Sequence, residues 1–139
     1  MLSDKNSRSI KVEIEISITD EDVGDLMCTA LEGGVGYWGC LDNTREEWKK
    51  YEEELFKDAT LDEVCALILL EGKSLYFIDV EDKKEIYELT LEKLFNGISK
   101  VVAIDSTLIQ DGKLDLCMID AEIADNIIQY GIFNELVFG

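Results

Sequence analysis

A run near the N-terminus alternates strictly between polar and apolar side chains, and it constrains the fold more than any other feature. In Ser9–Ile18 every second residue is Ile or Val, and the residues between them are Ser, Lys or Glu. Period-two alternation is typical of a β-strand with one buried and one exposed face. The run therefore predicts a strand whose Ile and Val side faces a core.

Helical patterns follow, each introduced by a capping residue. Thr19 is a predicted N-cap, the acids Asp20 to Asp22 suit a helix N-terminus, and Gly33-Gly34 ends this first helix. A mostly apolar helix is predicted from Leu61 to about Glu71. The other predicted helices begin after Thr44, after Thr90 (ending near Asn96-Gly97) and after Asp120.

Strand patterns lie between these helices. Ser74–Val80 and Glu85–Leu89 predict a hairpin, and Asp111-Gly112 predicts a turn. Three segments are harder to assign: Val101–Ile104 fits a strand or a helix continuation, Leu114–Ile119 fits a strand, and Leu136–Phe138 fits an edge strand.

Helices and strands mix without regular alternation, and this pattern favours an α+β fold over a doubly wound parallel sheet. We expect a small, largely antiparallel sheet with four to five helices packed mainly on one face. Residues 1–8 are polar and are predicted to be a flexible N-terminal tail. Residues 9–139 are predicted to form a single domain.

The chain is strongly acidic, with 31 Asp and Glu against 13 Lys and Arg, which gives a net charge of −18. Such a charge repels nucleic acid and anionic membrane and attracts basic surfaces. The 47% hydrophobic content argues against an acidic disordered tail. No apolar run reaches the ~18 residues of a membrane span, and the N-terminus lacks an apolar signal core. We therefore expect a cytoplasmic protein.

Most catalytic and metal-binding patterns are missing. The sequence has no histidine and no glycine-rich loop followed by Lys-Ser or Lys-Thr, which excludes triad and P-loop chemistry. The four cysteines, Cys28, Cys40, Cys65 and Cys117, are too far apart for a zinc or redox motif. Each lies beside apolar residues, so we expect buried free thiols, with no metal and no cofactor.

Two features are candidates for partner binding. The first is a set of acids from two acidic stretches, residues 19–32 with five acids and no base and residues 41–63 with nine acids and four bases: Asp20, Glu21, Asp22, Asp25, Glu46, Glu47, Glu52, Glu53 and Glu54. If folding gathers them, they form an anionic surface, although solvated acids that serve only solubility fit the same pattern. The second is the pair Tyr37 and Trp38 in a glycine-rich loop, which fits an apolar anchor, a pocket wall or a core plug.

Two blocks also resemble a known family. One comprises Ile18–Val23, Thr29–Gly34 and Tyr37-Trp38, and the other comprises Ala124–Phe133 and Glu135–Gly139. Together they resemble a family of small acidic, largely uncharacterised proteins of phages and prophages of Gram-positive gut bacteria. The resemblance implies a setting in a host bacterium, where small acidic phage proteins often block host enzymes such as nucleic-acid-guided defence nucleases.

The leading hypothesis is a non-enzymatic, anti-defence or anti-CRISPR-like inhibitor that occupies the basic groove of a host nuclease or another nucleic-acid-binding protein. It would contact neither nucleic acid nor membrane directly. The alternative is a small-ligand binder or enzyme that uses the Gly33–Trp38 loop and the C-terminal helix, with a pocket from Glu32, Asp125, Gln129 and Tyr130 beside the aromatic pair. A self-associating structural protein is a third possibility, and the oligomeric state stays open.

Overall fold

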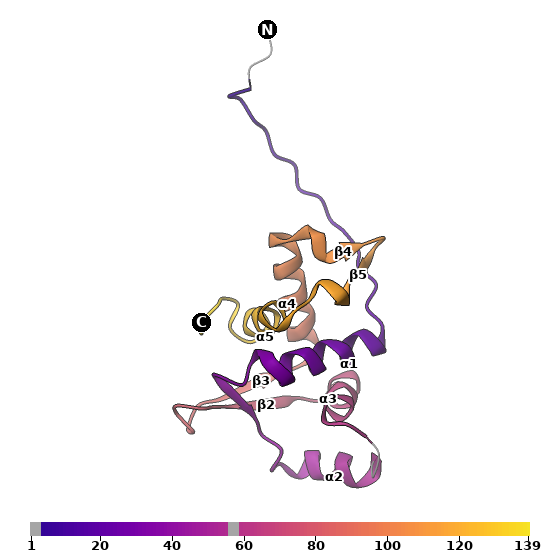
Figure 1. The fold of residues 1–139 in the computed structure, drawn as a ribbon, viewed down its shortest axis with the longest axis vertical. Coiled ribbons are helices and arrows are strands. Elements are labelled where there is room, and N and C mark those ends of the chain that lie inside the picture. Colours follow the sequence, from indigo (N-terminus) through magenta and orange to yellow (C-terminus); the bar gives the residue numbers. More distant parts are fainter. Residues whose placement is uncertain (1–3, 56–58) are drawn as a thin grey trace.

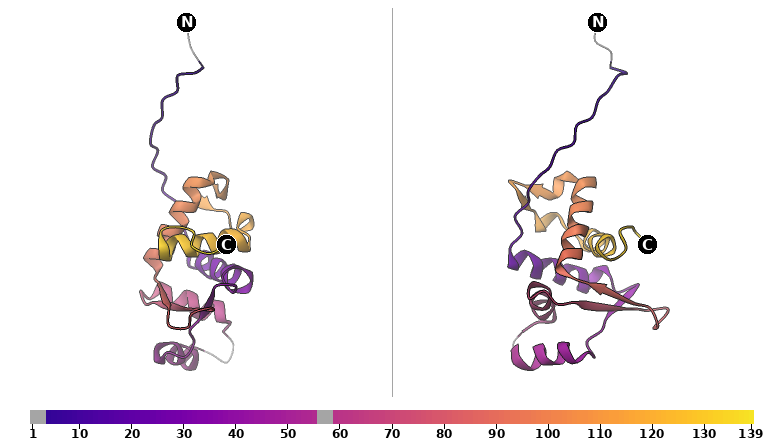
Figure 2. Two further views of the ribbon diagram at one scale, coloured as in Figure 1. Left: turned by 90° about the vertical axis from the view of Figure 1, so that its left-hand side faces the viewer. Right: turned by 180° about the vertical axis from the view of Figure 1, so that it is seen from behind.

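The computed structural model describes residues 4–55 and 59–139, and it confirms the α+β prediction. The described residues form the α-helices α1 (Asp20–Thr29), α2 (Glu46–Leu55), α3 (Leu61–Leu70), α4 (Leu91–Ile104) and α5 (Ala121–Phe133). The strands are β1 (Gly39–Leu41), β2 (Leu75–Asp79), β3 (Ile86–Leu89), β4 (Ile109–Gln110) and β5 (Lys113–Leu114). In Figures 1 and 2, α3 lies between α1 and α2, and α4 and α5 cross on the other side of α1.

Several helices begin where their capping residues predict. The Thr19 hydroxyl accepts a hydrogen bond from the Asp22 amide at 3.1 Å, and the Asp22 carboxylate accepts one from the Thr19 amide at 2.9 Å. This reciprocal pair is a capping box, which satisfies two amides that the first turn leaves without helical partners. Thr60, Thr90 and Asp120 cap α3, α4 and α5 through their side-chain oxygens.

The predicted cap at Thr44 is wrong. The Thr44 hydroxyl donates a hydrogen bond to the Asp42 carboxylate at 2.6 Å, and the Thr44 amide donates to the same oxygen at 3.0 Å. Among the described residues no amide of the first turn donates to the Thr44 side chain, and α2 begins at Glu46.

The predicted hairpin is confirmed as β2 and β3, which pair antiparallel with Leu75 opposite Leu89. β1 adds to the other edge of β2, so the sheet order is β1-β2-β3. The predicted turn at Asp111-Gly112 joins β4 and β5, and both residues have positive φ. The expected strand over Leu114–Ile119 is mostly wrong, because a 3₁₀ turn replaces it from Leu116 to Met118.

The helix after Thr90 does not end at Asn96-Gly97, so that prediction is wrong. It continues to Ile104, which makes Val101–Ile104 a helix continuation. Gly97 lies where α4 crosses α5, and a Cβ at this position would overlap the Ile127 carbonyl oxygen. The glycine therefore allows two helix backbones to approach closely and does not end the helix.

The alternating segment Ser9–Ile18 is not a strand with a buried face, contrary to the sequence prediction. Residues 9–16 are extended but have no strand partner among the described residues, and they lead away from the body in Figure 1. A parallel bridge between Ser17 and Lys113 ties the segment to the body. Ile10, Val12 and Ile14 are 86%, 71% and 60% exposed. The alternation is real, but the fold supplies no neighbouring strand for it.

The C-terminal segment Leu136–Phe138 is likewise not an edge strand. The backbone amides of Val137 and Phe138 instead donate hydrogen bonds to the side chain of Gln129 in α5.

No helix in the described part of the chain combines the length and apolar character that a membrane crossing would need.

Candidate functional site

The acids of α1 lie at the start of the helix and face solvent. Asp20, Glu21 and Asp25 are exposed, whereas Asp22 is partly buried because it completes the capping box. The helix has no basic residue in its last turn. Its positive N-terminal dipole stabilises the first three acids, so these charges also have a structural role.

The acids of α2 differ in this respect. Glu46 and Glu47 lie in the first turn, and Glu52, Glu53 and Glu54 follow more than one turn later. All five are exposed, while Trp48 and Tyr51 of the same helix are buried. The dipole at the start of α2 therefore stabilises Glu46 and Glu47 but not the three later acids.

Among the described residues, the ion pairs that form do not neutralise these helices. Arg45 pairs with Asp42 at 3.2 Å, and Lys93 pairs with Glu88 at 3.4 Å. Arg45 also lies over the ring of Tyr76, 3.5 Å from its centroid. The carboxylates of α1 and α2 take no part in these pairs.

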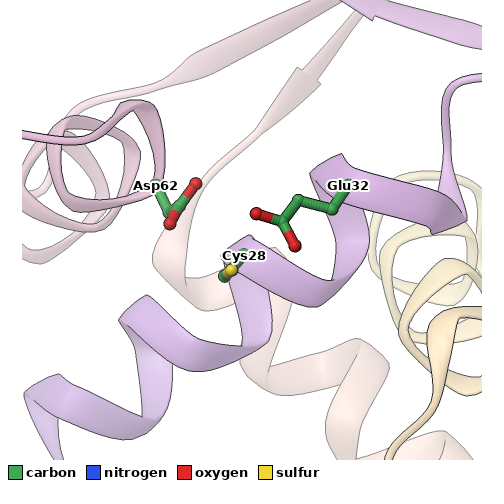
Figure 3. Close-up of side chains that lie close together, drawn as sticks. All are labelled: Cys28, Glu32 and Asp62. Carbon is green, nitrogen blue, oxygen red and sulfur yellow. The ribbon is translucent and has the colours of Figure 1, made fainter.

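The fold also brings acids from two elements together next to a cysteine. Figure 3 shows Glu32, which follows α1, directed toward Asp62 of α3, with Cys28 between them. Their ligand atoms all lie within 4.8 Å of one another. Burial first, and then hydrogen bonding to Asp62 and Glu32 and their negative charge, raise the pKa of the Cys28 thiol to about 11. The site is thus strongly anionic, and it joins the negative charge of α1 to that of α3.

Geometrically this cluster could hold a metal ion, but its chemistry fits one poorly. A thiol must lose its proton to bind a metal, and the raised pKa of the Cys28 thiol makes this loss more costly. The remaining donors are two carboxylates, of which Glu32 is exposed. Divalent cations of the hard type need more oxygen ligands than these two groups offer.

The prediction of buried free thiols is correct for Cys65 and wrong for others. All four thiols are free, but Cys28 is only partly buried, and Cys40 and Cys117 are exposed. Cys40 is on the exposed side of the edge strand β1, and Cys117 lies in the exposed 3₁₀ turn. Apolar neighbours in the sequence therefore did not predict the exposure of Cys40 and Cys117 correctly.

Four of the residues proposed as an alternative pocket meet in one buried network. The Asp125 carboxylate accepts hydrogen bonds from the Tyr37 hydroxyl at 2.6 Å, the Trp38 indole N–H at 2.7 Å and the Gln129 amide at 2.9 Å. Burial and the adjacent Asp125 charge raise the pKa of Tyr37. Glu32 lies instead beside Cys28, and Tyr130 takes no part in these bonds.

The network holds the C-terminus to the core. The Gln129 side-chain oxygen accepts hydrogen bonds from the backbone amides of Val137 and Phe138, at 2.9 and 2.8 Å. The Phe138 ring stacks on Trp38 with centroids 4.9 Å apart. Within residues 4–55 and 59–139, every buried side-chain nitrogen or oxygen has a hydrogen-bond partner. The polar atoms of this network are engaged with one another, which suits a structural connection better than a ligand pocket.

The same network changes the interpretation of the aromatic pair. Trp38 is 2% exposed and packs against Phe133 and Phe138, so it leaves no ring surface for a partner. Tyr37 is 54% exposed. Of the two expected anchors, only Tyr37 lies at the surface.

Sequence reasoning missed the close approach of Glu32 to Asp62. These residues are far apart in the sequence, so no short-range pattern predicts that they meet.

Comparison with known proteins gives no match to a family model, a curated protein or a solved structure.

Proposed function

We propose that the protein is a non-enzymatic, acidic binding protein that occupies a basic groove of a nucleic-acid-binding protein. The supporting observation is the close approach of Glu32, which follows α1, to Asp62 of α3, because it brings the acidic stretches of two segments together. A partner groove that normally holds phosphates presents Lys and Arg side chains. Carboxylates fixed on helices can pair with such groups.

The exposed acids of α2 also support binding. Glu52, Glu53 and Glu54 lie beyond the first turn of α2, where the helix dipole does not stabilise them. In a complex, Lys and Arg of a basic partner would pair with these carboxylates. The phage-type resemblance points to a host defence nuclease or polymerase as the partner.

The test is direct binding to purified RNA-guided nucleases and RNA polymerase of Gram-positive bacteria, with duplex DNA as competitor. We expect binding that DNA displaces and that weakens at least tenfold between about 0.05 and about 0.5 M salt, because salt screens exposed charges. Binding that DNA leaves unaffected would contradict groove occupation.

Charge-neutralised variants locate the surface. The α2 variant Glu52→Gln/Glu53→Gln/Glu54→Gln and the α1 variant Asp20→Asn/Glu21→Gln/Asp25→Asn are expected to bind weakly. The matched control, Glu81→Gln/Glu85→Gln/Glu92→Gln, removes three exposed acids from the hairpin loop and α4 and should bind normally. Equal loss in all three variants would mean that only net charge matters, and the proposed surface would be wrong.

A further inference from the structure

The extended segment Ser9–Ile18, here called the arm, carries an apolar face that residues 4–55 and 59–139 leave open. Ile16 and Ile18 pack against the core, but Ile10, Val12 and Ile14 are mostly exposed. Figures 1 and 2 show the arm leaving the body next to α4. A row of exposed aliphatic side chains on an unpaired, extended backbone is a ready site for strand addition.

An apolar groove separates the arm from α4. Its volume is about 640 Å³, and its walls include Val12, Ile14 and Ile16 on one side and Phe95, Ile98 and Val102 on the other. Phe95 and Ile104 of α4 are also exposed, at 39% and 71%. The groove is therefore mainly apolar, with Ser99 and Ser106 as its polar lining residues, and another strand beside the arm would cover it.

The sequence of the arm is complementary to itself. In an antiparallel pair of arms centred on Val12, Lys11 of each copy lies opposite Glu13 of the other, and Ile10 lies opposite Ile14. Opposite charges and aliphatic pairs at facing positions both stabilise antiparallel strands. Such a pair has two-fold symmetry, as expected for a homodimer.

The neighbouring registers are unfavourable. Centring the pair on Lys11 or Glu13 places like charges opposite each other at the axis, and centring it on Ile14 places Glu13 opposite Glu15. Registers centred between two residues put aliphatic side chains opposite polar ones and split the apolar face. Among the registers centred from residue 11 to residue 14, the one at Val12 alone combines unlike charge pairs and a continuous apolar face without placing like charges opposite each other.

The distribution of charge also permits two copies to meet here. Residues 1–18 contain three acids and three bases, so the whole excess of 18 negative charges lies in residues 19–139. In the Val12 register the two Ile16 residues are eight positions apart, or roughly 27 Å at 3.4 Å per residue. That separation exceeds the ~8 Å over which charges act at physiological salt, so the two acidic bodies repel each other weakly.

We propose that two copies of this chain dimerise through antiparallel pairing of their arms about Val12, with the aliphatic face of the ribbon over the α4 groove of each copy. Each copy then places its Ile10 beside Ile14 of the other, at the groove. The dimer uses none of the acidic residues assigned to partner binding, so the two proposals stand independently.

The first test measures mass and proximity in the full chain. Analytical ultracentrifugation from low to high micromolar concentration should show a monomer–dimer equilibrium that persists at about 0.5 M salt, where binding to a basic partner is at least tenfold weaker. In a Cys40→Ser/Cys117→Ser background, Val12→Cys should form an intermolecular disulfide on oxidation, because facing Cα atoms lie about 4.5–5.5 Å apart. In the control Ser9→Cys the two introduced cysteines are six positions apart along the ribbon, roughly 20 Å, so they should not form a disulfide.

The second test exchanges charges. Lys11→Glu and Glu13→Lys should each weaken dimerisation about tenfold, since each places like charges opposite each other twice. The double variant Lys11→Glu/Glu13→Lys should restore it. An unchanged far-UV CD spectrum would show that these arm substitutions leave the body folded. A monomer at all concentrations, equal crosslinking of Val12→Cys and Ser9→Cys, or a double variant as weak as the single ones would overturn the proposal.

Discussion

Removal of the Asp125 carboxylate should strongly destabilise the fold. Asp125 is buried and accepts hydrogen bonds from Tyr37, Trp38 and Gln129. A hydrogen bond to a charged group contributes about 1.5–3 kcal/mol, and a buried donor left without a partner costs about 1–3 kcal/mol. The Tyr37 hydroxyl can bond to water because this residue is half exposed, so the loss of its bond to Asp125 lowers the free energy of unfolding least. We therefore expect Asp125→Ala to lower the free energy of unfolding by about 3–5 kcal/mol.

The assay is urea unfolding followed by tryptophan fluorescence and far-UV CD. Asp125→Asn keeps the shape and one acceptor oxygen, so it should cost about 1–2 kcal/mol. The control Glu135→Ala removes an exposed acid near the same C-terminus and should change stability by less than about 0.5 kcal/mol.

A double-mutant cycle tests the proposed cause. Trp38→Phe removes the indole donor, so combining it with Asp125→Ala should cost less than the sum of the two single changes. An Asp125→Ala loss below about 1 kcal/mol, or strict additivity with Trp38→Phe, would refute the view that this carboxylate holds the core and the C-terminus together.

Three further predictions concern packing and ionisation. Gly97→Ala should cost about 3 kcal/mol or more in urea unfolding because its Cβ meets helix backbone, whereas Gly36→Ala, with open space around its Cβ, should not. The pKa of Tyr87 is raised from 10.0 to about 12 by burial and by its bond to Asp79, so stability should be full below pH 10 and fall as the pH rises toward 12, and Tyr87→Phe should reduce this fall in unfolding midpoints. The Cys28 thiol should react slowly with Ellman's reagent at pH 8 because its pKa is raised. Cys28→Ser should therefore leave the amplitude of the fast reaction of the exposed thiols unchanged, and a smaller fast amplitude would contradict the raised pKa.

The sequence by itself determined the local elements of this protein. Thr19, Thr60, Thr90 and Asp120 begin helices because a side-chain oxygen satisfies amides of the first turn, an interaction within three residues. The β2–β3 hairpin and the Asp111-Gly112 turn are local in the same sense. The α+β class follows from the order of these elements.

The tertiary structure decided which faces meet and which stay exposed. Gly97 resembles a helix end in the sequence but is a crossing point with α5, and Ser9–Ile18 resembles a half-buried strand but finds no neighbour. The same holds for the Asp125 network and for the approach of Glu32 to Asp62, which join residues far apart in the chain. Periodicity shows that a face is apolar, but only the packing of distant segments decides whether anything covers it.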